Sequence, residues 1–164
     1  MRGNTSPKYH IREARTEDAL SILDLIADEV RAGRMLPRKL GEVQVCIGYW
    51  RVAVIDEQIV GCVSLVFFND ELCELRSLAV AADHRGNGLG SGLISSSLDL
   101  ARERDMARVL TLTRSTHLFE QLGFQQDLIL NFPEKVWRDC LPCPLRHQCD
   151  EVALTYYLNK KAKS

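Results

Sequence analysis

The sequence predicts a single α/β domain, and three features support this. Its 164 residues fall within the usual size of one domain, and 46% are apolar, enough to fill a core without disulfides. Two runs rich in β-branched and aromatic residues, 51–55 and 59–68, flank a three-residue polar turn, which is typical of an antiparallel hairpin. A further strand at 73–80 leads through a glycine-rich loop into a helix, which adds the α/β character.

The N-terminal part of the chain predicts a strand followed by a helix. A short strand is expected at residues 9–13, and Thr16 is the expected N-cap of the helix. Apolar residues then recur at three- and four-residue spacing, which buries one helix face, and Gly33 is a natural stop. Residues 42–47 are expected to form a second, short helix.

The rest of the chain alternates helices and strands. After the glycine loop, the expected elements are a helix at 91–104, a strand at 108–113, a helix at 116–122, and strands at 126–130 and 151–158. No internal repeat or low-complexity linker interrupts this order.

Charge and hydropathy argue against two classes of partner. Lys plus Arg number 21 and Asp plus Glu 22, so no global basic field favours nucleic acid. The longest apolar run, 59–68, is half of the ~20 residues that span a bilayer, so no membrane partner is expected. Residues 1–9 lack the apolar stretch of a secretory signal, and the expected location is cytoplasmic.

The loop Arg85-Gly86-Asn87-Gly88-Leu89-Gly90 lies between a predicted strand and a predicted helix. Backbone N–H groups and the positive helix end can hold an anion such as pyrophosphate at such a junction. No Lys-Ser or Lys-Thr follows the glycines, which excludes a P-loop, and Ser91 stands where a dinucleotide fingerprint needs its third glycine. The alternative is a flexible glycine turn without a ligand.

The motif Arg85-x-x-Gly88-x-Gly90 resembles the acetyl-CoA loop of the GNAT N-acetyltransferases. The strand at 74–80 and the segment 118–124 stand in the order and spacing of that family. The resemblance covers residues 9–158 and implies one domain with a central mixed, mostly antiparallel sheet flanked by helices. Within it, residues 133–150 form a C-terminal cysteine-containing segment, and residues 1–8 and 159–164 are expected to be flexible termini.

The resemblance also implies acetyl-CoA as the acetyl donor. Backbone groups of Leu78 and Val80 are then expected to contact the pantetheine and the thioester. The residues expected to hold the pyrophosphate are Arg85, Gly86, Asn87, Gly88, Leu89, Gly90 and Ser91. Family members commonly pair, so a homodimer is an open alternative to a monomer.

Three segments resemble short-form bacterial N-acetylglutamate synthases more narrowly: 36–38, 112–117 and the tail at 135–151. This implies acetylation of the α-amine of a small amino acid, with glutamate favoured, at the first step of arginine biosynthesis. An acetyltransferase for another amino acid or amine is one alternative. A non-catalytic acyl-CoA-binding regulatory module is the other, because Phe119 stands where GNAT enzymes often have a tyrosine acid.

Residue types suggest the chemistry of the remaining site. Glu74 is the candidate base for removing a proton from the acceptor ammonium, and a structural pair with Arg76, two positions along the same strand, is the alternative. A dicarboxylate acceptor favours arginine forks, for which the candidates are Arg38, Arg114 and Arg76, with surface charges as the alternative. Ser115 is a further candidate contact to the acceptor.

A cysteine cluster near the C-terminus could have a separate role. Cys140, Cys143, His147 and Cys149 supply the four ligands of a structural zinc site, but they lie within ten residues, closer than common zinc motifs place their ligands. Zinc, free thiols in a packed tail and a redox-sensitive pair remain open, with free thiols favoured over a metal. No role in acetyl transfer is expected for any of them.

Overall fold

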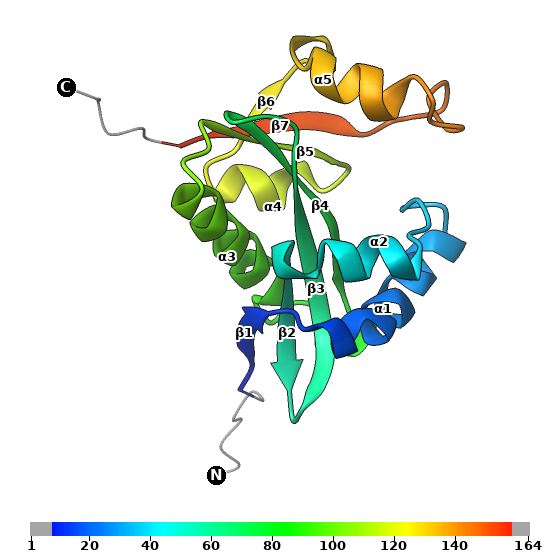
Figure 1. Cartoon of the computed structure of the whole chain (residues 1–164), viewed down its shortest axis with the longest axis vertical. Coiled ribbons are helices and arrows are strands. Elements are labelled where there is room, and N and C mark those ends of the chain that lie inside the picture. Colours follow the sequence, from blue (N-terminus) through cyan, green and yellow to red (C-terminus); the bar gives the residue numbers. More distant parts are fainter. Residues whose placement is uncertain (1–7, 159–164) are drawn as a thin grey trace, which may run out of the picture. The chain divides into compact units, whose positions relative to one another are not determined.

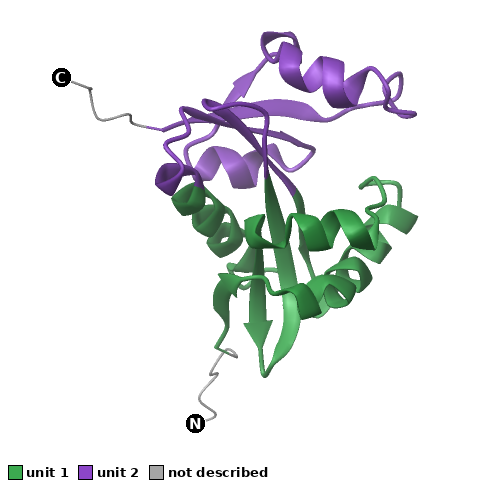
Figure 2. Cartoon of the chain, viewed as in Figure 1, with its two compact units in different colours: residues 1–65, 77–100 green, residues 66–76, 101–164 purple. Residues whose placement is uncertain are grey.

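The computed structural model describes residues 8–158, so the expected flexible termini lie outside the described residues except for residue 8. Within it the chain forms two compact units, coloured separately in Figure 2. Unit 1 holds residues 8–65 and 77–100, and unit 2 holds residues 66–76 and 101–158. Two strands of the sheet pass from one unit into the other, so a single sheet runs through both.

The sheet has seven strands in the order β1-β2-β3-β4-β5-β7-β6 (Figure 1). They are β1 (His10–Glu13), β2 (Trp50–Ile55), β3 (Gln58–Phe67), β4 (Leu72–Val80), β5 (Arg108–Thr113), β6 (Gln125–Asp127) and β7 (Val152–Tyr157). β1 pairs antiparallel with β2, β2 with β3, and β7 with both β5 and β6, whereas β4 and β5 are parallel. The expected mixed, mostly antiparallel sheet is therefore confirmed.

Helices complete the fold, and none of those described is long and apolar enough to cross a bilayer. They are α1 (Ala19–Arg31), α2 (Leu40–Val45), α3 (Leu89–Glu103), α4 (Thr116–Gln121) and α5 (Pro133–Lys135). Short 3₁₀ turns lie at Thr16–Asp18, Ile47–Tyr49, Ala82–His84 and Ile129–Asn131, and a π-helical segment, Val136–Cys140, continues α5. The predicted helices are present, with ends shifted by a few residues.

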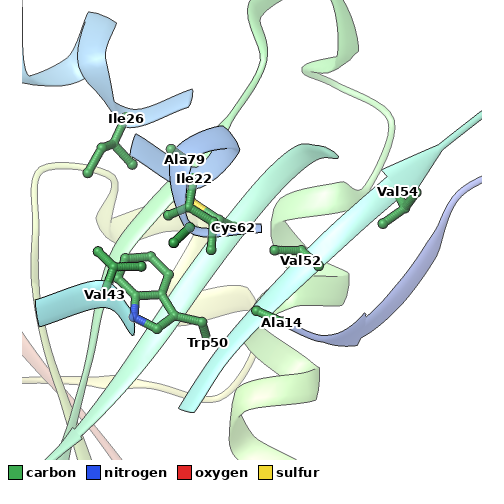
Figure 3. Close-up of a cluster of buried hydrophobic side chains, with 10 residues drawn as sticks. Ala14, Ile22, Ile26, Val43, Trp50, Val52, Val54, Cys62 and Ala79 are labelled. Carbon is green, nitrogen blue, oxygen red and sulfur yellow. The ribbon is translucent and has the colours of Figure 1, made fainter. Parts of the chain in front are cut away.

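The core of unit 1 lies between the sheet and two helices. Alternate residues of β2 point to one face because side chains of a strand alternate. Figure 3 shows these side chains against α1 and α2. The buried cluster comprises Ala14, Ala19, Ile22, Ile26, Val43, Trp50, Val52, Val54, Cys62 and Ala79.

On the opposite face of the unit 1 sheet, α3 packs closely against Gly61. A Cβ added to Gly61 would lie 2.9 Å from Leu93 Cδ1 and 3.3 Å from the Ala53 Cβ. A larger residue would therefore force the Leu93 side chain to shift. The helix that follows the glycine loop is thus fixed by its packing on β3.

The start of α1 differs from the predicted one. Thr16 is not the N-cap, because a 3₁₀ turn capped by Arg15 precedes the α-helix and Asp18 is the N-cap of α1. The Arg15 N–H donates to Asp18 Oδ2 at 2.7 Å, and the Arg12 guanidinium donates to both oxygens of the same carboxylate at 2.7 and 3.2 Å. The bond from Arg12 is the main reason that the pKa of Asp18 is lowered. A longer-range ion pair thus replaces the local hydroxyl cap.

Unit 2 has its own core around Phe132, which is fully buried. Leu72, Leu110 and Ala153, from β4, β5 and β7, form a cluster with its ring. Cys73, the next residue of β4, is also buried, and its Sγ lies 3.8 Å from the Arg108 carbonyl oxygen.

The strand predicted at 126–130 is wrong in its second half. β6 ends at Asp127, whose Oδ1 accepts hydrogen bonds from the Leu128 N–H at 2.8 Å and from Asn131 Nδ2 at 2.7 Å. A side chain that binds the backbone just after it favours a turn over an extended strand. The chain therefore turns into the helical segment that carries Phe132, which the sequence analysis did not predict.

Burial on α1 gives a matched stability test. Ile22 is 0% exposed and Leu20, two residues earlier, is 64% exposed. Replacing Ile22 with Ala should lower the free energy of unfolding by about 2 to 5 kcal/mol, because a buried cavity remains. Leu20→Ala should change it by no more than about 0.5 kcal/mol. Urea unfolding of both variants measures the difference, and equal losses would contradict this orientation of α1.

Candidate functional site

β4 carries an unusual backbone conformation at Ser77. This buried residue has φ +58°, in the left-handed region that side chains other than glycine rarely adopt. Such conformations cost about 1 to 3 kcal/mol and cluster at functional sites. The Ser77 hydroxyl accepts a hydrogen bond from Arg38 Nε at 3.4 Å, and its carbonyl oxygen lies 3.6 Å from Cys62 Sγ. The structure thereby places Arg38, a predicted acceptor contact, against the irregular part of β4.

The loop after β4 presents a run of unused backbone donors. Gly86 and Gly88 have φ of +82° and +81°, which turn the chain sharply before α3 begins at Leu89. Among the described residues, the N–H groups of residues 86–91 have no hydrogen-bond acceptor. Six consecutive donors at the positive end of a fifteen-residue helix form a site suited to a phosphate or pyrophosphate.

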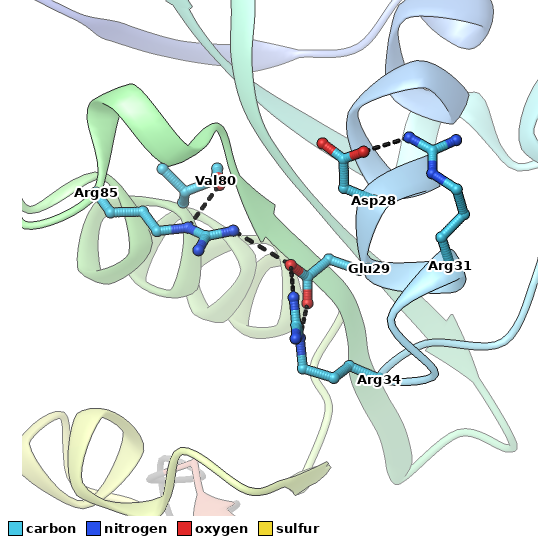
Figure 4. A network of polar contacts seen from close by, with 6 residues as sticks. All are labelled: Asp28, Glu29, Arg31, Arg34, Val80 and Arg85. Carbon is cyan, nitrogen blue, oxygen red and sulfur yellow. Dashed lines mark hydrogen bonds and ion pairs between the residues drawn. The ribbon is translucent and has the colours of Figure 1, made fainter.

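The side chain of Arg85 anchors this loop to α1 (Figure 4). Its Nε donates to the Val80 carbonyl oxygen at 3.1 Å, and its Nη2 donates to Glu29 Oε1 at 3.2 Å. Arg34 donates to both oxygens of Glu29 at 2.8 and 3.0 Å, and this is the main cause of the lowered pKa of Glu29. The guanidinium of Arg85 thus points toward α1, and the sequence analysis missed Glu29 because its partners lie far away in the chain.

In unit 2, the parallel pairing of β4 with β5 is short. It covers Leu72–Glu74 against Arg108–Leu110, and the register does not continue beyond these three pairs. At the next position Thr111 donates its side-chain hydroxyl to the Leu75 carbonyl oxygen at 2.9 Å. The rest of β5 keeps its pairing with β7. The backbone pairing of the two parallel strands therefore ends at Glu74, and a side-chain hydrogen bond still joins them at Leu75.

Glu74 lies in a buried ion pair with Lys135. Nζ of Lys135 lies 3.0 Å from Oε1 and 2.8 Å from Oε2 of Glu74, and 3.1 Å from Asp139 Oδ2. Arg76 Nη1 lies 3.9 Å from the same Asp139 oxygen. Glu74 and Arg76 thus face one helical segment, as strand alternation predicts. The sequence analysis missed Lys135, whose one local signal is the four-residue spacing to Asp139.

The predicted residues Arg114 and Ser115 follow the end of β5. Arg114 Nε donates to Asp150 Oδ1 at 2.6 Å, and the Ser115 N–H donates to the Thr113 hydroxyl at 2.8 Å. The adjacent Glu151 is half-buried, and burial is the main reason that its pKa is raised. The positive charge of Arg114 has the largest charge effect on Glu151, and it lowers the pKa of that carboxyl. The sequence analysis missed both carboxylates.

Phe119 and the cysteine tail contribute no reactive group to this arrangement. Phe119 is buried, with its ring edge-on to Phe124 at a centroid distance of 5.2 Å. Within residues 8–158, no three His, Cys, Asp or Glu side chains lie together as metal ligands, so Cys140, Cys143, His147 and Cys149 do not form a four-ligand site there. Burial raises the pKa of the Cys140 thiol, which favours its protonated form.

The predicted site residues thus divide between the units. Unit 1 carries Arg38, Leu78, Val80 and the loop through Ser91, gathered around the end of β4 and the start of α3. Unit 2 carries Glu74, Arg76, Arg114 and Ser115, on β4 and at the end of β5.

Comparison with known proteins matches the chain to one protein family and to several relatives. The model of the acetyltransferase (GNAT) family matches residues 14–124. An uncharacterized N-acetyltransferase of Chlorobaculum tepidum is 33% identical over 88% of this chain and 93% of its own length. An amino-acid acetyltransferase of Mycobacterium tuberculosis is 31% identical over 71% of this chain and 68% of its own length.

A solved structure shares the fold at lower identity. The N-acetylglutamate synthase of Neisseria gonorrhoeae, complexed with coenzyme A and N-acetyl-glutamate, superposes with a TM-score of 0.80 at 24% identity. The match covers 95% of this chain and 36% of the synthase chain, so this chain corresponds to about a third of that protein.

The anchor of the glycine loop can be tested by a charge-removing variant. Glu29→Gln should speed hydrogen exchange at the hydrogen-bonded amides of Arg85 and Gly92, which flank the loop, by about tenfold, as for loss of a charge-assisted hydrogen bond. Because the pKa of Glu29 is lowered in the fold, this protection is present above the usual glutamate pKa and declines as the pH falls through the folded value. Exchange measured by mass spectrometry, corrected for intrinsic rates, gives the comparison.

The matched control is Asp28→Asn. Asp28 pairs with Arg31 on the exposed side of the same helix (Figure 4) and makes no hydrogen bond to the loop among the described residues. Its removal should leave exchange at the amides of Arg85 and Gly92 unchanged. Similar effects of the two variants would show that the loop responds to α1 as a whole rather than to Glu29.

Proposed function

Because the chain belongs to the GNAT acetyltransferase family, we propose that it transfers an acetyl group from acetyl-CoA to the α-amine of a small amino acid. L-Glutamate is the favoured acceptor, which would place the enzyme at the first step of arginine biosynthesis. The observation that carries the donor half of this proposal is the run of six unused N–H groups ahead of α3. The acceptor half is supported by the similarity to amino-acid acetyltransferases.

The donor would bind through backbone groups. The N–H groups of residues 86–91 would hold the pyrophosphate, and the positive end of α3 would add to their attraction. Arg85 would contribute by fixing the loop against Glu29 and Val80. Leu78 and Val80, beyond the strained Ser77, would offer backbone groups to the pantetheine and thioester.

Transfer requires the acceptor ammonium to lose a proton before its nitrogen attacks the thioester carbonyl carbon. Glu74 is the proposed proton acceptor, through a water molecule because its side chain is buried. As the C–N bond forms, the C–S bond breaks and the thiolate of CoA leaves. Phe119 carries no O–H to protonate it, but a thiol with a pKa of about 8.5 is a tolerable leaving group without an acid.

Two arginines would recognise the carboxylates of the acceptor. Arg38 lies beside the irregular Ser77, and Arg114 lies at the end of β5. Each guanidinium can bind a carboxylate through two parallel hydrogen bonds. Arg114 already shares one donor with Asp150, an exposed side chain that an acceptor carboxylate could displace. Arg76 is the third candidate, on the same strand face as Glu74.

One observation favours a second candidate function. The buried Phe119, packed on Phe124, leaves the family's usual acid position without a hydroxyl. A module that binds acyl-CoA without turnover would need no such acid. This alternative predicts tight CoA binding and no thiol release with any amine.

Thiol release decides between these functions. CoA thiol should appear from acetyl-CoA with millimolar glutamate, and more slowly with glutamine, aspartate or buffer alone. Release with another amine only would keep the transferase and overturn glutamate as the acceptor. Binding of CoA with no release from any amine would support the regulatory module.

The two arginines are tested separately from the donor site. Arg38→Ala and Arg114→Ala should each raise the KM for glutamate by about tenfold to a hundredfold, as for loss of a charged hydrogen-bond pair. The KM for acetyl-CoA should stay the same. Arg31→Ala is the control, because Arg31 pairs with Asp28 on the surface of α1. An unchanged KM for the acceptor in both variants would argue for a different amine substrate.

A further inference from the structure

The buried pair of Glu74 and Lys135 is unusual in this chain because both charged side chains are almost fully enclosed. Glu74 is 2% exposed and Lys135 is 8% exposed. Removing two charges from water costs several kcal/mol per ion, and an apolar pair of the same volume is often at least as stable. Stability alone is therefore a weak reason for placing an ion pair here.

The geometry directs the whole ammonium group of Lys135 to carboxylates. Both oxygens of Glu74 lie within 3.0 Å of Nζ, and Asp139 Oδ2 lies 3.1 Å away. Glu74 Oε1 and Asp139 Oδ2 accept hydrogen bonds from Nζ, whereas Glu74 Oε2, although close to Nζ, is buried without a hydrogen-bond partner among the described residues. Asp139 comes from the π-helical segment after α5, a helix type found frequently at functional sites.

We propose that Lys135 is a positioning residue for the acetyl-transfer reaction: it holds the carboxylate of Glu74 in place where the backbone pairing of β4 with β5 ends. This inference rests on the proposed function, in which Glu74 takes up the proton of the acceptor. Lys135 does not touch the substrates in this scheme. It acts through Glu74, and Asp139 holds Lys135 in turn.

Other charged groups near the pair come from three elements. Arg76 is on β4, Arg138 lies 3.7 Å from Asp139, and Glu151 precedes β7. Glu151 and Cys140 are also coupled by charge to both Glu74 and Lys135. The full set around the pair is Arg76, Arg138, Asp139, Cys140 and Glu151. Lys135 makes the shortest contact with Glu74 among them, so its removal should have the largest effect on proton uptake there.

The test is the pH profile of kcat/KM for the acceptor in Lys135→Met. Without Nζ, a buried carboxylate takes up a proton more readily, so the acid limb of the profile should move up by about 1 to 3 pH units. Lys135→Arg, which keeps the positive charge, should restore most of the wild-type profile. Lys8→Met, at an exposed lysine, is the control and should leave the profile unchanged.

The double variant Glu74→Gln/Lys135→Met covers the case in which Lys135→Met does not fold. It leaves no unpaired charge of the pair in the core. If Lys135 acts only through Glu74, the double variant should retain the same activity as Glu74→Gln alone. A further loss of tenfold or more in the folded double variant would overturn the inference.

The remaining outcomes separate the two proposals. A folded Lys135→Met with lower thermal stability but a wild-type pH profile would make Lys135 purely structural and overturn the inference, while the proposed function stands. Absence of turnover by the wild-type protein with every amine would overturn the proposed function and this inference together. A shifted acid limb that Lys135→Arg restores supports both.

Discussion

The parallel contact between β4 and β5 is the constraint on which the candidate site depends. It lasts for three residue pairs and ends at Glu74, where a Thr111 hydroxyl takes over the bond to the next carbonyl. Three residues further along, the chain adopts the left-handed conformation of Ser77. β4 therefore offers backbone and side-chain groups that a regular central strand would use in its ladder. Glu74 and the residues proposed to hold acetyl-CoA lie on this strand or directly after it, whereas Arg38 and Arg114 come from other segments.

Charge is handled differently in the two units. In unit 1, Glu29 binds Arg34 and Arg85 at a partly exposed position. The ion pair with Arg85 mainly restricts the glycine loop. In unit 2, the charges of Glu74 and Lys135 are enclosed, so each depends on the other far more strongly. A surface network tolerates the loss of one member, whereas an enclosed pair does not. The first arrangement suits binding and the second suits control of a proton.

Features that depend on neighbours in the chain could be predicted from the sequence. The hairpin, the glycine loop and the helix after it follow from alternation, turn residues and periodicity, and the structure has all three. The mixed, mostly antiparallel sheet was predicted from the family resemblance. The end of β6 was wrong because Asp127 binds the turn that follows it.

Features that join distant segments could not be predicted in the same way. Lys135 is 61 residues from Glu74, and Glu29 is 56 residues from Arg85. The local sequence around these residues does not predict their partners, because a single charged residue usually lies on the surface in contact with water. Arg38 was predicted from the resemblance of its segment, and Glu74 from its position on the strand beside the glycine loop.

The two buried thiols on the sheet give each unit an internal reporter. Burial raises the pKa of Cys62 and of Cys73 to about 12, so neither thiol is a reactive thiolate at neutral pH in the folded state. Cys62 belongs to unit 1 and Cys73 to unit 2. Their rates of alkylation therefore report the opening of each unit separately. Equal rates would mean that the shared sheet makes the whole fold cooperative, and unequal rates would rank the units by local stability.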